Sequence, residues 1–375
     1  MEEVKIIHTG DLHIGSSRSD VINGKAEIIN TFFRIVKLCE TERVDFLLIS
    51  GDLFETPFAE TDTVTEIIDA IEKIPETIVA ISPGNHDCAC AGSVYSVADF
   101  PKNVIIFNTL DDYFLFPQKN VCLFGAAFKS NFESDSMLKR PETLNPDFIN
   151  ICVLHGDIVS SAAESKYNPI TASQIANCGF DYLALGHIHK RTEISKIGAT
   201  FFSYCGCPDG RGFDEYGSRG LYLGTVTKGH CNLQYVEMSS RKYIFDSVDI
   251  SDCETSLSIT SKILSYLQES YAPDYEKNLY RISLNGILPA SFVPNIDQIQ
   301  STIDHQLTYI QITDRTETDL TDIATIAKEN SLRGLFVQKM LQMIANAAES
   351  EKDLHYRALR FGLKAFEKGV CLHDN

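Results

Sequence analysis

The first 240 residues alternate short apolar runs with segments of helical periodicity. Residues 4–8 and 45–50 are predicted strands, and the second is apolar enough to be buried on both faces. Between them, residues 24–42 place their apolar side chains on one wide helical face. A second helix over 60–73 and a strand over 77–81 continue the series. This alternation predicts an α/β sheet with at least three parallel strands.

The pattern changes after residue 100, where short strands follow one another with little helix between them. The predicted strands are 104–107, 121–126, 149–154, 182–185, 200–202, 221–226 and 233–236, and one helix is predicted over 171–177. So many short strands after an α/β start predict two sheets packed face to face, with helices outside them.

The remaining residues have a different organisation. Strands at 243–249 and 279–284 flank a helix over 255–269, which predicts a β-α-β unit. A helix over 296–306 and a strand over 309–312 complete a small α+β module. Two amphipathic segments follow, 332–348 and a basic helix over 352–368. Their apolar stripes must be buried, either in their own domain or against a partner.

Composition narrows the class of protein. The chain has 375 residues, 44% hydrophobic and 22% charged, which fits a globular protein of two or three domains. It contains no apolar run long enough for a membrane span, and its acidic start is unlike a secretory signal. The eleven cysteines are scattered, as reduced thiols are. We therefore expect a cytoplasmic protein with no membrane association.

The net charge of −18 argues against a general attraction for nucleic acid. It favours small polar ligands, protein partners or metal cations. The stretch 331–370 differs, with seven basic and four acidic side chains. An anionic polymer such as nucleic acid would have to be bound locally, by metal ions or by short basic patches.

Five short segments share one property, because each places a carboxylate, amide or imidazole group directly after an apolar strand. They are Gly10–His13, Gly51–Phe54, Gly84–Asp87, Leu154–Asp157 and Gly186–His189. Open α/β sheets build their sites at the carboxyl ends of strands, and flanking glycines let the backbone approach an ion closely. A single such segment is weak evidence, and Gly84–Asp87 alone could be a turn. Five in one chain predict a metal site.

The donor types indicate which ions fit. Oxygen and imidazole ligands suit Mn²⁺, Fe²⁺ or Zn²⁺, and Mg²⁺ is also compatible. The candidate ligands are Asp11, His13, Asp52, Asn85, His155, His187 and His189. Seven ligands are too many for one ion and suit two. Two ions a few ångströms apart can stabilise both the attacking and the leaving oxygen of a phosphoryl transfer, and Asp52 is the natural bridge.

The order and spacing of these segments resemble the calcineurin-like metallophosphoesterase superfamily over residues 3–240. The Asp-Leu-His-Ile-Gly start, the Gly-Asp-Leu-Phe-Glu segment and the stretch Phe100–Val104 further resemble bacterial DNA-repair exonuclease subunits of the SbcD and YhaO type. The resemblance implies a four-layer β-sandwich flanked by helices over 1–240. It also implies a small α+β cap facing DNA over 241–315, and C-terminal helices over 316–375 that dock on a coiled-coil, SMC-like ATPase. Such subunits form homodimers.

The resemblance also assigns roles to residues. Asp11, His13, Asp52 and His189 would hold one metal, and Asp52, Asn85, His155 and His187 the other. Mn²⁺ is the favoured ion, and a water bridging the two ions would be activated for in-line attack on a phosphodiester. His86 would not be a ligand but would protonate the leaving oxygen or stabilise the transition state. Asp87 is expected to orient its imidazole.

Four basic residues near the last ligands are candidates for DNA contacts. Lys190 and Arg191 follow His189 directly, whereas Arg211 and Arg219 lie in a glycine-rich loop. Solvated surface positions explain all four equally well. The preceding loop carries Cys205 and Cys207 where many relatives have serine, and these thiols are either sensitive to oxidation or inert.

The expected function is a two-metal-dependent DNA nuclease, the exonuclease subunit of a DNA-repair complex. One alternative keeps the chemistry and changes the substrate to nucleotides or phosphoproteins, which the net charge of −18 favours. Another is a non-catalytic regulatory subunit that uses the site as a scaffold. The presence of all seven ligands and of His86 argues against that alternative.

Overall fold

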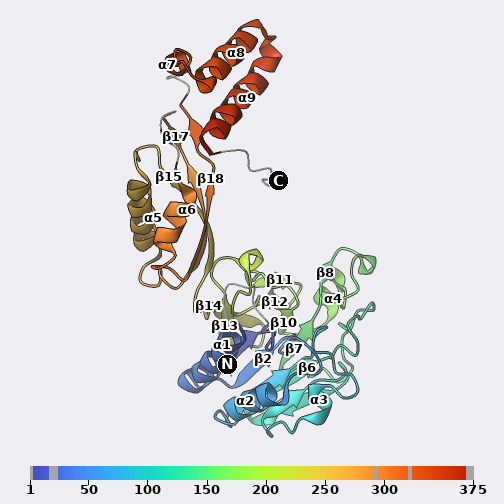
Figure 1. Ribbon diagram of the computed structural model, residues 1–375. Helices are drawn as coiled ribbons and strands as arrows, with labels where there is room; N and C mark the ends of the chain where they lie inside the picture. The colour runs from blue at the N-terminus through green and yellow to red at the C-terminus, as the bar shows by residue number, and fades with distance from the viewer. Residues whose placement is uncertain (1–2, 17–23, 290–291, 293, 320–322, 369–375) are drawn as a thin grey trace. The chain divides into compact units, whose positions relative to one another are not determined.

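The computed structural model describes residues 3–16, 24–289, 292, 294–319 and 323–368 (Figure 1). The chain divides into two compact units, Met1–Lys242 and Tyr243–Asn375, and each unit has hydrophobic cores of its own. The domain boundary expected between residues 315 and 316 stays a prediction.

The first sheet of the first unit has six strands, four of them parallel. Its order is β14 (His230–Glu237), β13 (Gly220–Thr227), β1 (Val4–Thr9), β2 (Phe46–Ile49), β3 (Ile78–Ile81) and β4 (Val104–Ile106). Strands β1 to β4 run parallel, and β13 pairs antiparallel with β1 and β14. The predicted series of at least three parallel strands is therefore confirmed.

The second sheet is also mixed. Its order is β11 (Ser195–Ile197), β12 (Thr200–Tyr204), β10 (Tyr182–Gly186), β7 (Ile149–His155), β6 (Val121–Gly125) and β5 (Tyr113–Phe116). The four inner strands are parallel, and β5 and β11 are antiparallel edge strands. Neither edge strand was predicted, because both are short and largely exposed. Strands β8 (Ile158–Val159) and β9 (Ile170–Thr171) form a separate pair.

Three hydrophobic cores hold these sheets and their helices together. Helices α1 (Gly24–Glu42) and α2 (Thr61–Ile71) pack on one face of the first sheet, where Phe32 and Ile67 join Leu47 in a core. Helix α4 (Ala172–Asn177) packs on one face of the second sheet. Between the sheets, residues such as Leu48 and Ile151 form the third core. The predicted α/β fold, with two sheets flanked by helices, is confirmed. Helix α3 (Val94–Val97) and 3₁₀ turns at Pro117–Lys119, Ala162–Glu164 and Phe213–Glu215 complete the elements of this unit.

The second unit starts with a parallel three-stranded sheet. Its elements are β15 (Tyr243–Asp249), α5 (Ser256–Tyr271), β16 (Leu279–Asn285), α6 (Ile296–Ile303) and β18 (Tyr309–Asp314), and the strand order is β15-β16-β18. Both helices pack against one face of the sheet. Because helical crossovers join parallel strands, this module is α/β and not the α+β expected from the sequence. Short strands β17 (Ile287–Leu288) and β19 (Glu317–Thr318) pair beside it.

Helices α7 (Ile323–Ile326), α8 (Leu332–Asn346) and α9 (Glu349–Lys368) follow and share a small core that includes Val337 and Leu359. Other apolar side chains of α8 and α9 are exposed, among them Leu335, Leu354 and Phe361. Among the described residues, no helix combines the length and apolar character that crossing a bilayer requires.

Candidate metal centre

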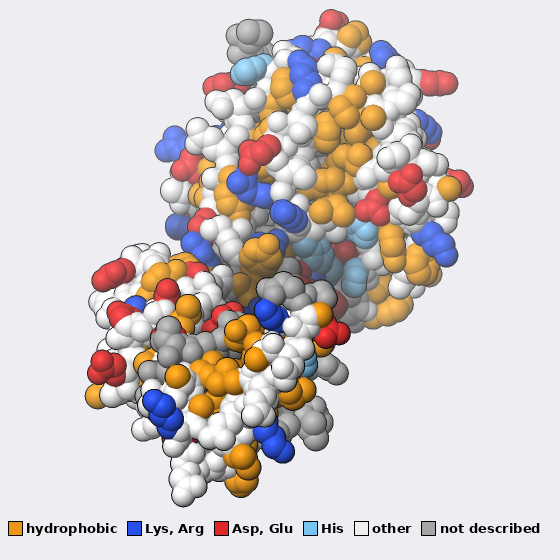
Figure 2. All heavy atoms as spheres, turned by 90° about the horizontal axis from the view of Figure 1, so that it is seen from above, with side chains coloured by type: hydrophobic (Ala, Val, Ile, Leu, Met, Phe, Trp, Pro, Cys, Tyr) orange, Lys and Arg blue, Asp and Glu red, His pale blue; other side chains and the backbone are white. Residues whose placement is uncertain are grey.

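The predicted ligands lie at the carboxyl ends of five strands from the two sheets. Asp11, Asp52 and Asn85 follow β1, β2 and β3 of the first sheet. His155 ends β7 of the second sheet, and His187 follows β10. The two facing sheets therefore direct their ligands to one place, as strand ends of α/β sheets do. On the face drawn in Figure 2, several histidine side chains lie close together near the middle of the view, and others stand apart.

The backbone at these strand ends is strained in a specific way. Asp11, His13, Asp52 and His187 have φ angles of 50°, 50°, 48° and 100°. A non-glycine residue with a positive φ angle costs about 1–3 kcal/mol of stability, and such backbone strain concentrates at functional sites. Backbone hydrogen bonds hold the first two turns, because Asp11 N–H donates to Gly51 at 3.0 Å and His13 N–H to Asp52 at 2.9 Å. The ligand positions are thus built into the loops.

The seven side chains form two adjoining groups. His13 Nε2 lies 3.2 Å from His189 Nε2, and both belong to a cluster with Asp11. Asn85 Oδ1 lies 2.9 Å from His155 Nε2 and 3.1 Å from His187 Nδ1. Asp52 lies between the groups, with Oδ2 3.7 Å from His13 Nε2 and 3.4 Å from His155 Nε2. Asp11 adjoins both groups too, since its carboxylate also accepts the His187 N–H at 3.1 Å.

The outward nitrogen of each histidine faces an oxygen atom. The pairs are His13 Nδ1 with Glu55 at 2.9 Å, His155 Nδ1 with the Ser50 carbonyl at 3.0 Å, His187 Nε2 with Asp157 at 3.4 Å, and His189 Nδ1 with Glu215 at 2.6 Å. The contacts of His155 and His189 are hydrogen bonds, and an acceptor at the outward nitrogen favours the tautomer whose inward nitrogen carries the lone pair. His13 Nδ1 lies beside Glu55 without a hydrogen bond. The inward nitrogens of His13 and His189 face each other at 3.2 Å, and that of His155 faces an Asn85 oxygen at 2.9 Å. Converging acceptors of this kind fit divalent cations.

Charges around the two groups favour a cation as well. Burial acts against a charged imidazole, yet the Asp52 and Asp11 carboxylates raise the pKa of His155 to about 9. Burial likewise disfavours a charged Asp52, but the imidazoles of His155 and His13 hold the pKa of its carboxyl well below the usual range. The donor set, its burial and its charge therefore fit two ions with oxygen and nitrogen ligands.

His86 differs from the ligands in exposure. Its side chain is 43% exposed, whereas that of His155 is fully buried. The backbone N–H of His86 donates to Asp52 Oδ1 at 2.9 Å, and its ring lies edge-on to His13 at 4.7 Å between centroids. The imidazole is thus held at the open rim of the ligand groups, where a substrate could reach it.

Asp87 does not contact the His86 imidazole as expected. Its carboxylate is buried and accepts hydrogen bonds from Gly84 N–H at 2.7 Å, Phe54 N–H at 3.1 Å and the Tyr95 hydroxyl at 2.5 Å. The side chain points beneath the loop while that of His86 points out of it. Asp87 therefore fastens the loop that carries Asn85 and His86, and the carboxylate near the His86 ring is Glu55, at 3.8 Å.

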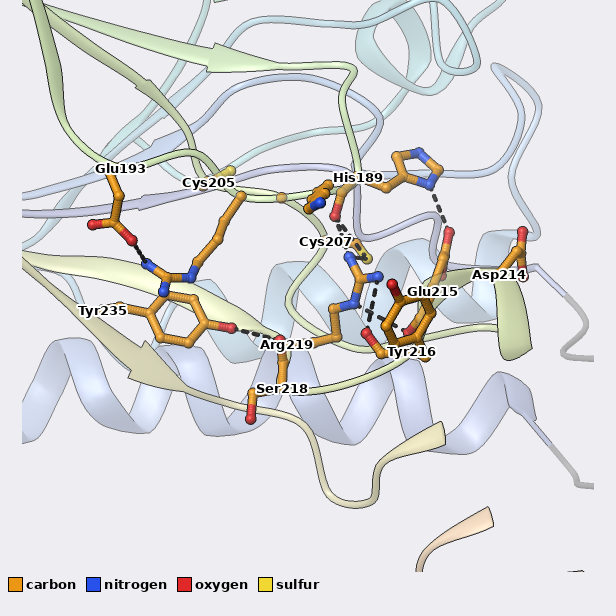
Figure 3. Close-up of a pocket in the computed structure, with 13 residues that line it drawn as sticks. His189, Glu193, Cys205, Cys207, Asp214, Glu215, Tyr216, Ser218, Arg219 and Tyr235 are labelled. Carbon is orange, nitrogen blue, oxygen red and sulfur yellow. Dashed lines mark hydrogen bonds and ion pairs between the residues drawn. The ribbon is translucent and has the colours of Figure 1, made fainter. Parts of the chain in front are cut away.

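The four predicted DNA contacts fall in two places. Lys190, Arg191 and Arg219 line a pocket of about 590 Å³ next to His189 (Figure 3). Lys190 is exposed, whereas Arg191 pairs with Glu193 at 3.0 Å and Arg219 donates to the backbone carbonyls of His189 and Glu215. Arg211 lies instead between Glu55 and Glu215. Thus three of the four candidates gather, and the fourth contacts carboxylates.

The two unusual cysteines line this pocket, and both are almost fully buried. Burial raises the pKa of both the Cys205 and the Cys207 thiol far above the ordinary value. Cys205 Sγ lies 3.7 Å from Ser50 Oγ. Both side chains are therefore neutral thiols, and a thiol without thiolate character is a poor target for oxidation.

Sequence patterns did not point to the carboxylates around the ligands. Glu55, Asp157 and Glu215 each face the outward nitrogen of a ligand histidine. Glu215 is 5% exposed although it lies in a glycine-rich loop, which is an uncommon position for an acidic residue. The segments named from the sequence already contained Glu55 and Asp157, but the contacts of these carboxylates with His13 and His187 depend on the folded loops.

Comparisons with known proteins agree with this site. A family model for calcineurin-like phosphoesterases matches residues 4–191. The chain is 25% identical over 268 residues to the uncharacterized metallophosphoesterase YhaO of Bacillus subtilis (strain 168), which is 68% of this chain and 65% of the relative. It is 23% identical over 240 residues to the DNA double-strand break repair protein Mre11 of Saccharolobus solfataricus, covering 60% and 61%. The aligned region thus spans less than two thirds of either relative.

Among solved structures, that of TT1561 from Thermus thermophilus matches with a TM-score of 0.40 and 12% identity, covering 63% of this chain and 99% of that one. The family model, in contrast, spans half of this chain and includes all seven predicted ligands and His86. The buried histidine and aspartate clusters are consistent with the two-metal site typical of that family. The chain belongs to the calcineurin-like phosphoesterase family.

Proposed function

We propose that the protein is a metal-dependent nuclease that hydrolyses phosphodiester bonds in DNA. One observation carries the proposal: imidazole nitrogens, an amide oxygen and carboxylates from seven side chains converge beside an exposed histidine, His86. Family membership supports phosphoester chemistry, and the similarity to the Mre11 repair protein supports DNA as the substrate.

The ligands would hold two divalent ions in adjoining sites. Asp11, His13 and His189 would bind one, Asn85, His155 and His187 the other, and Asp52 would contact both. When bound, Mn²⁺, or Fe²⁺, Zn²⁺ or Mg²⁺ in its place, supplies positive charge for the phosphate and lowers the pKa of water.

His86 would act on the substrate directly. Its partly exposed ring projects at the rim of the ligand groups, and its backbone is tied to Asp52. A protonated His86 would donate its proton to the leaving oxygen, or stabilise the charge that develops on the phosphate. Asp87 and Tyr95 would keep the loop in place, so the imidazole meets the phosphate in one orientation.

DNA would have to bind against the overall charge of −18. On the face shown in Figure 2, basic and acidic side chains are interspersed. Lys190, Arg191 and Arg219 line the pocket beside His189 together, although Glu193, Asp214 and Glu215 line it too, and Lys190 is exposed there. We propose that this pocket receives a backbone phosphate next to the one that is cleaved.

Two partners are also proposed. Exposed apolar side chains on α8 and α9, such as Leu335, Leu354 and Phe361, support docking on a coiled-coil, SMC-like ATPase. A groove of about 580 Å³ along α2 and α3, lined by residues that include Phe58 and Val97, supports a homodimer.

The test uses the purified full chain with Mn²⁺, an end-labelled linear duplex and the small diester bis-p-nitrophenyl phosphate. The variants are His86→Ala and, as a matched control, His230→Ala, which changes an exposed histidine on β14. We expect both substrates to be cleaved by the wild type and the control, and neither by His86→Ala with metal still bound.

Other outcomes would overturn parts of the proposal. Cleavage of the small diester without DNA, even after the ATPase partner is added, would favour a nucleotide or phosphoprotein substrate. Inactivity on both substrates despite two bound ions would favour a non-catalytic regulatory subunit.

A further inference from the structure

Arg211 is largely buried and contacts two carboxylates. Its side chain is 20% exposed, so it offers little surface to a substrate. Nη2 lies 2.9 Å from Glu215 Oε1, Nη1 lies 3.5 Å from Glu55 Oε2, and its backbone N–H donates to Glu215 Oε2 at 2.7 Å. One guanidinium thus joins two carboxylates that are 160 residues apart in the sequence.

The same two carboxylates face two ligand histidines. Glu55 Oε2 lies 2.9 Å from His13 Nδ1, and Glu215 Oε1 lies 2.6 Å from His189 Nδ1. The inward nitrogens of these histidines meet at 3.2 Å. His13, Glu55, Arg211, Glu215 and His189 therefore form a closed ring of contacts, here called the carboxylate clamp.

The charges of the clamp are balanced around Arg211. Burial disfavours a charged Glu215, but hydrogen bonds from His189 and Arg211 hold the pKa of its carboxyl well below the usual range. Arg211 Nη2 lies 2.9 Å from both Glu215 Oε1 and His189 Nδ1, and His189 Nδ1 lies 2.6 Å from Glu215 Oε1, so the three groups form one hydrogen-bonded cluster. The tautomer of His189 with its proton on Nδ1 donates the shortest of these contacts, 2.6 Å to Glu215, and carries its lone pair on Nε2.

We propose that Arg211, with Glu55 and Glu215, is a positioning device that fixes the tautomer and orientation of His13 and His189 for their shared ion. The inference rests on the proposed two-metal centre, and it adds that the two ligand groups are supported by different residues. The other group has no arginine in this position among its described contacts, since His155 faces a backbone carbonyl and His187 faces Asp157. The two ions would thus depend on different supports.

Simple electrostatics predicts the opposite effect for Arg211. A cationic side chain next to His189 repels a metal ion, so its removal should strengthen metal binding if charge alone matters. Under the positioning account, removal frees Glu55 and Glu215, and the two histidines lose their orientation. Metal binding should then weaken although a positive charge has been removed. The sign of the change therefore separates the two accounts.

The experiment measures Mn²⁺ affinity by isothermal titration of the full chain in two single-ion backgrounds. Asn85→Ala removes a ligand of one ion, and His13→Ala removes a ligand of the other. We expect Arg211→Gln to weaken the ion that remains in Asn85→Ala by about 10–100-fold, as loss of outer support to metal ligands does. In the His13→Ala background, Arg211→Gln should change the affinity less than twofold.

Two further variants keep the test decisive. Glu55→Gln alters the half-exposed end of the clamp and serves if Arg211→Gln fails to fold, with the same expected loss. Asp157→Asn makes the matching change beside His187, and it should weaken only the ion that remains in His13→Ala. Activity is not needed for any of these readouts.

Unchanged or tighter Mn²⁺ binding by Arg211→Gln in the Asn85→Ala background would overturn the clamp and leave the two-metal centre intact. Equal loss in both backgrounds would also overturn it, because the effect would then be general. Failure of the wild type to bind two ions would instead refute the proposed centre itself.

Discussion

Gly206 offers a direct perturbation of the loop that supports His189. It lies between Cys205 and Cys207 with a φ of +72°, a conformation that favours glycine. A Cβ added there would lie 2.7 Å from the Arg191 nitrogen and 2.8 Å from the His189 carbonyl oxygen. Both are backbone atoms, so neither can move as the end of a flexible side chain would.

The cost of Gly206→Ala has two parts. Alanine at positive φ costs about 1–2 kcal/mol, and forcing a Cβ against packed backbone costs about 1–3 kcal/mol more. The contacts fall short of the shortest ordinary van der Waals separation by roughly 0.6–0.7 Å, so the segment around His189 must shift by about that amount. A full ångström of misplacement costs about 100-fold in rate. We therefore expect Gly206→Ala to lower Mn²⁺ affinity and diesterase activity about tenfold.

Gly229→Ala is the matched control. Gly229 lies in the turn between β13 and β14 with a φ of +73°, and an added Cβ there meets nothing within 4 Å. It carries the same backbone penalty without the contact at His189. The assay compares chemical denaturation, Mn²⁺ titration and bis-p-nitrophenyl phosphate hydrolysis for the two variants. Equal stability, metal affinity and activity in both variants would refute the packing of this loop against His189.

Three more perturbations address other parts of the account. Burial lowers the pKa of His8 to about 3. Between pH 6.5 and pH 3 His8 is therefore protonated in the unfolded chain and neutral in the folded chain, so the free energy of unfolding falls as the pH falls. The free energy of unfolding of the wild type, measured with denaturant relative to His8→Gln, should therefore fall by about 2 kcal/mol from pH 7 to pH 5. A difference between the two proteins that does not change with pH would contradict a neutral buried His8. Tyr95→Phe removes a donor to the buried Asp87 carboxylate and should cost about 1–3 kcal/mol in the same assay, with lower diesterase activity because the His86 loop loosens. Lys190→Ala should reduce the slope of log affinity for DNA against log salt by about 1, and an unchanged slope would remove Lys190 from the DNA contacts.

Local hydrophobic patterns in the sequence predict many of the helices and strands. The apolar face of 24–42 predicts α1 because one stripe of a helix must be buried, and α1 spans Gly24–Glu42. The predicted β-α-β unit agrees with the parallel pairing of β15 and β16, whereas hydrophobic periodicity does not encode the direction in which β18 joins them. Nor does it mark β5, whose Tyr113–Leu115 side chains are exposed at a sheet edge.

The ligands were predictable for a physical reason that does not extend to their supports. A polar residue such as Asp11 or Asp52 directly after a buried strand has few structural uses, so its position alone indicates a site. Glu55 and Glu215 gain their roles only when distant loops meet at Arg211. Asp87 shows the same limit, because its contacts with Phe54 and Tyr95 depend on how the loop folds.

The most direct test of the two-metal centre is the number of Mn²⁺ ions that the chain binds. Isothermal titration should give two ions per chain, and electron paramagnetic resonance should show that their spins are coupled, as expected for ions about 3.5–4 Å apart. Asp52→Ala should weaken both ions, because its carboxylate lies between the two groups. One ion per chain, two uncoupled ions, or two coupled ions with unchanged affinity in Asp52→Ala would contradict the account.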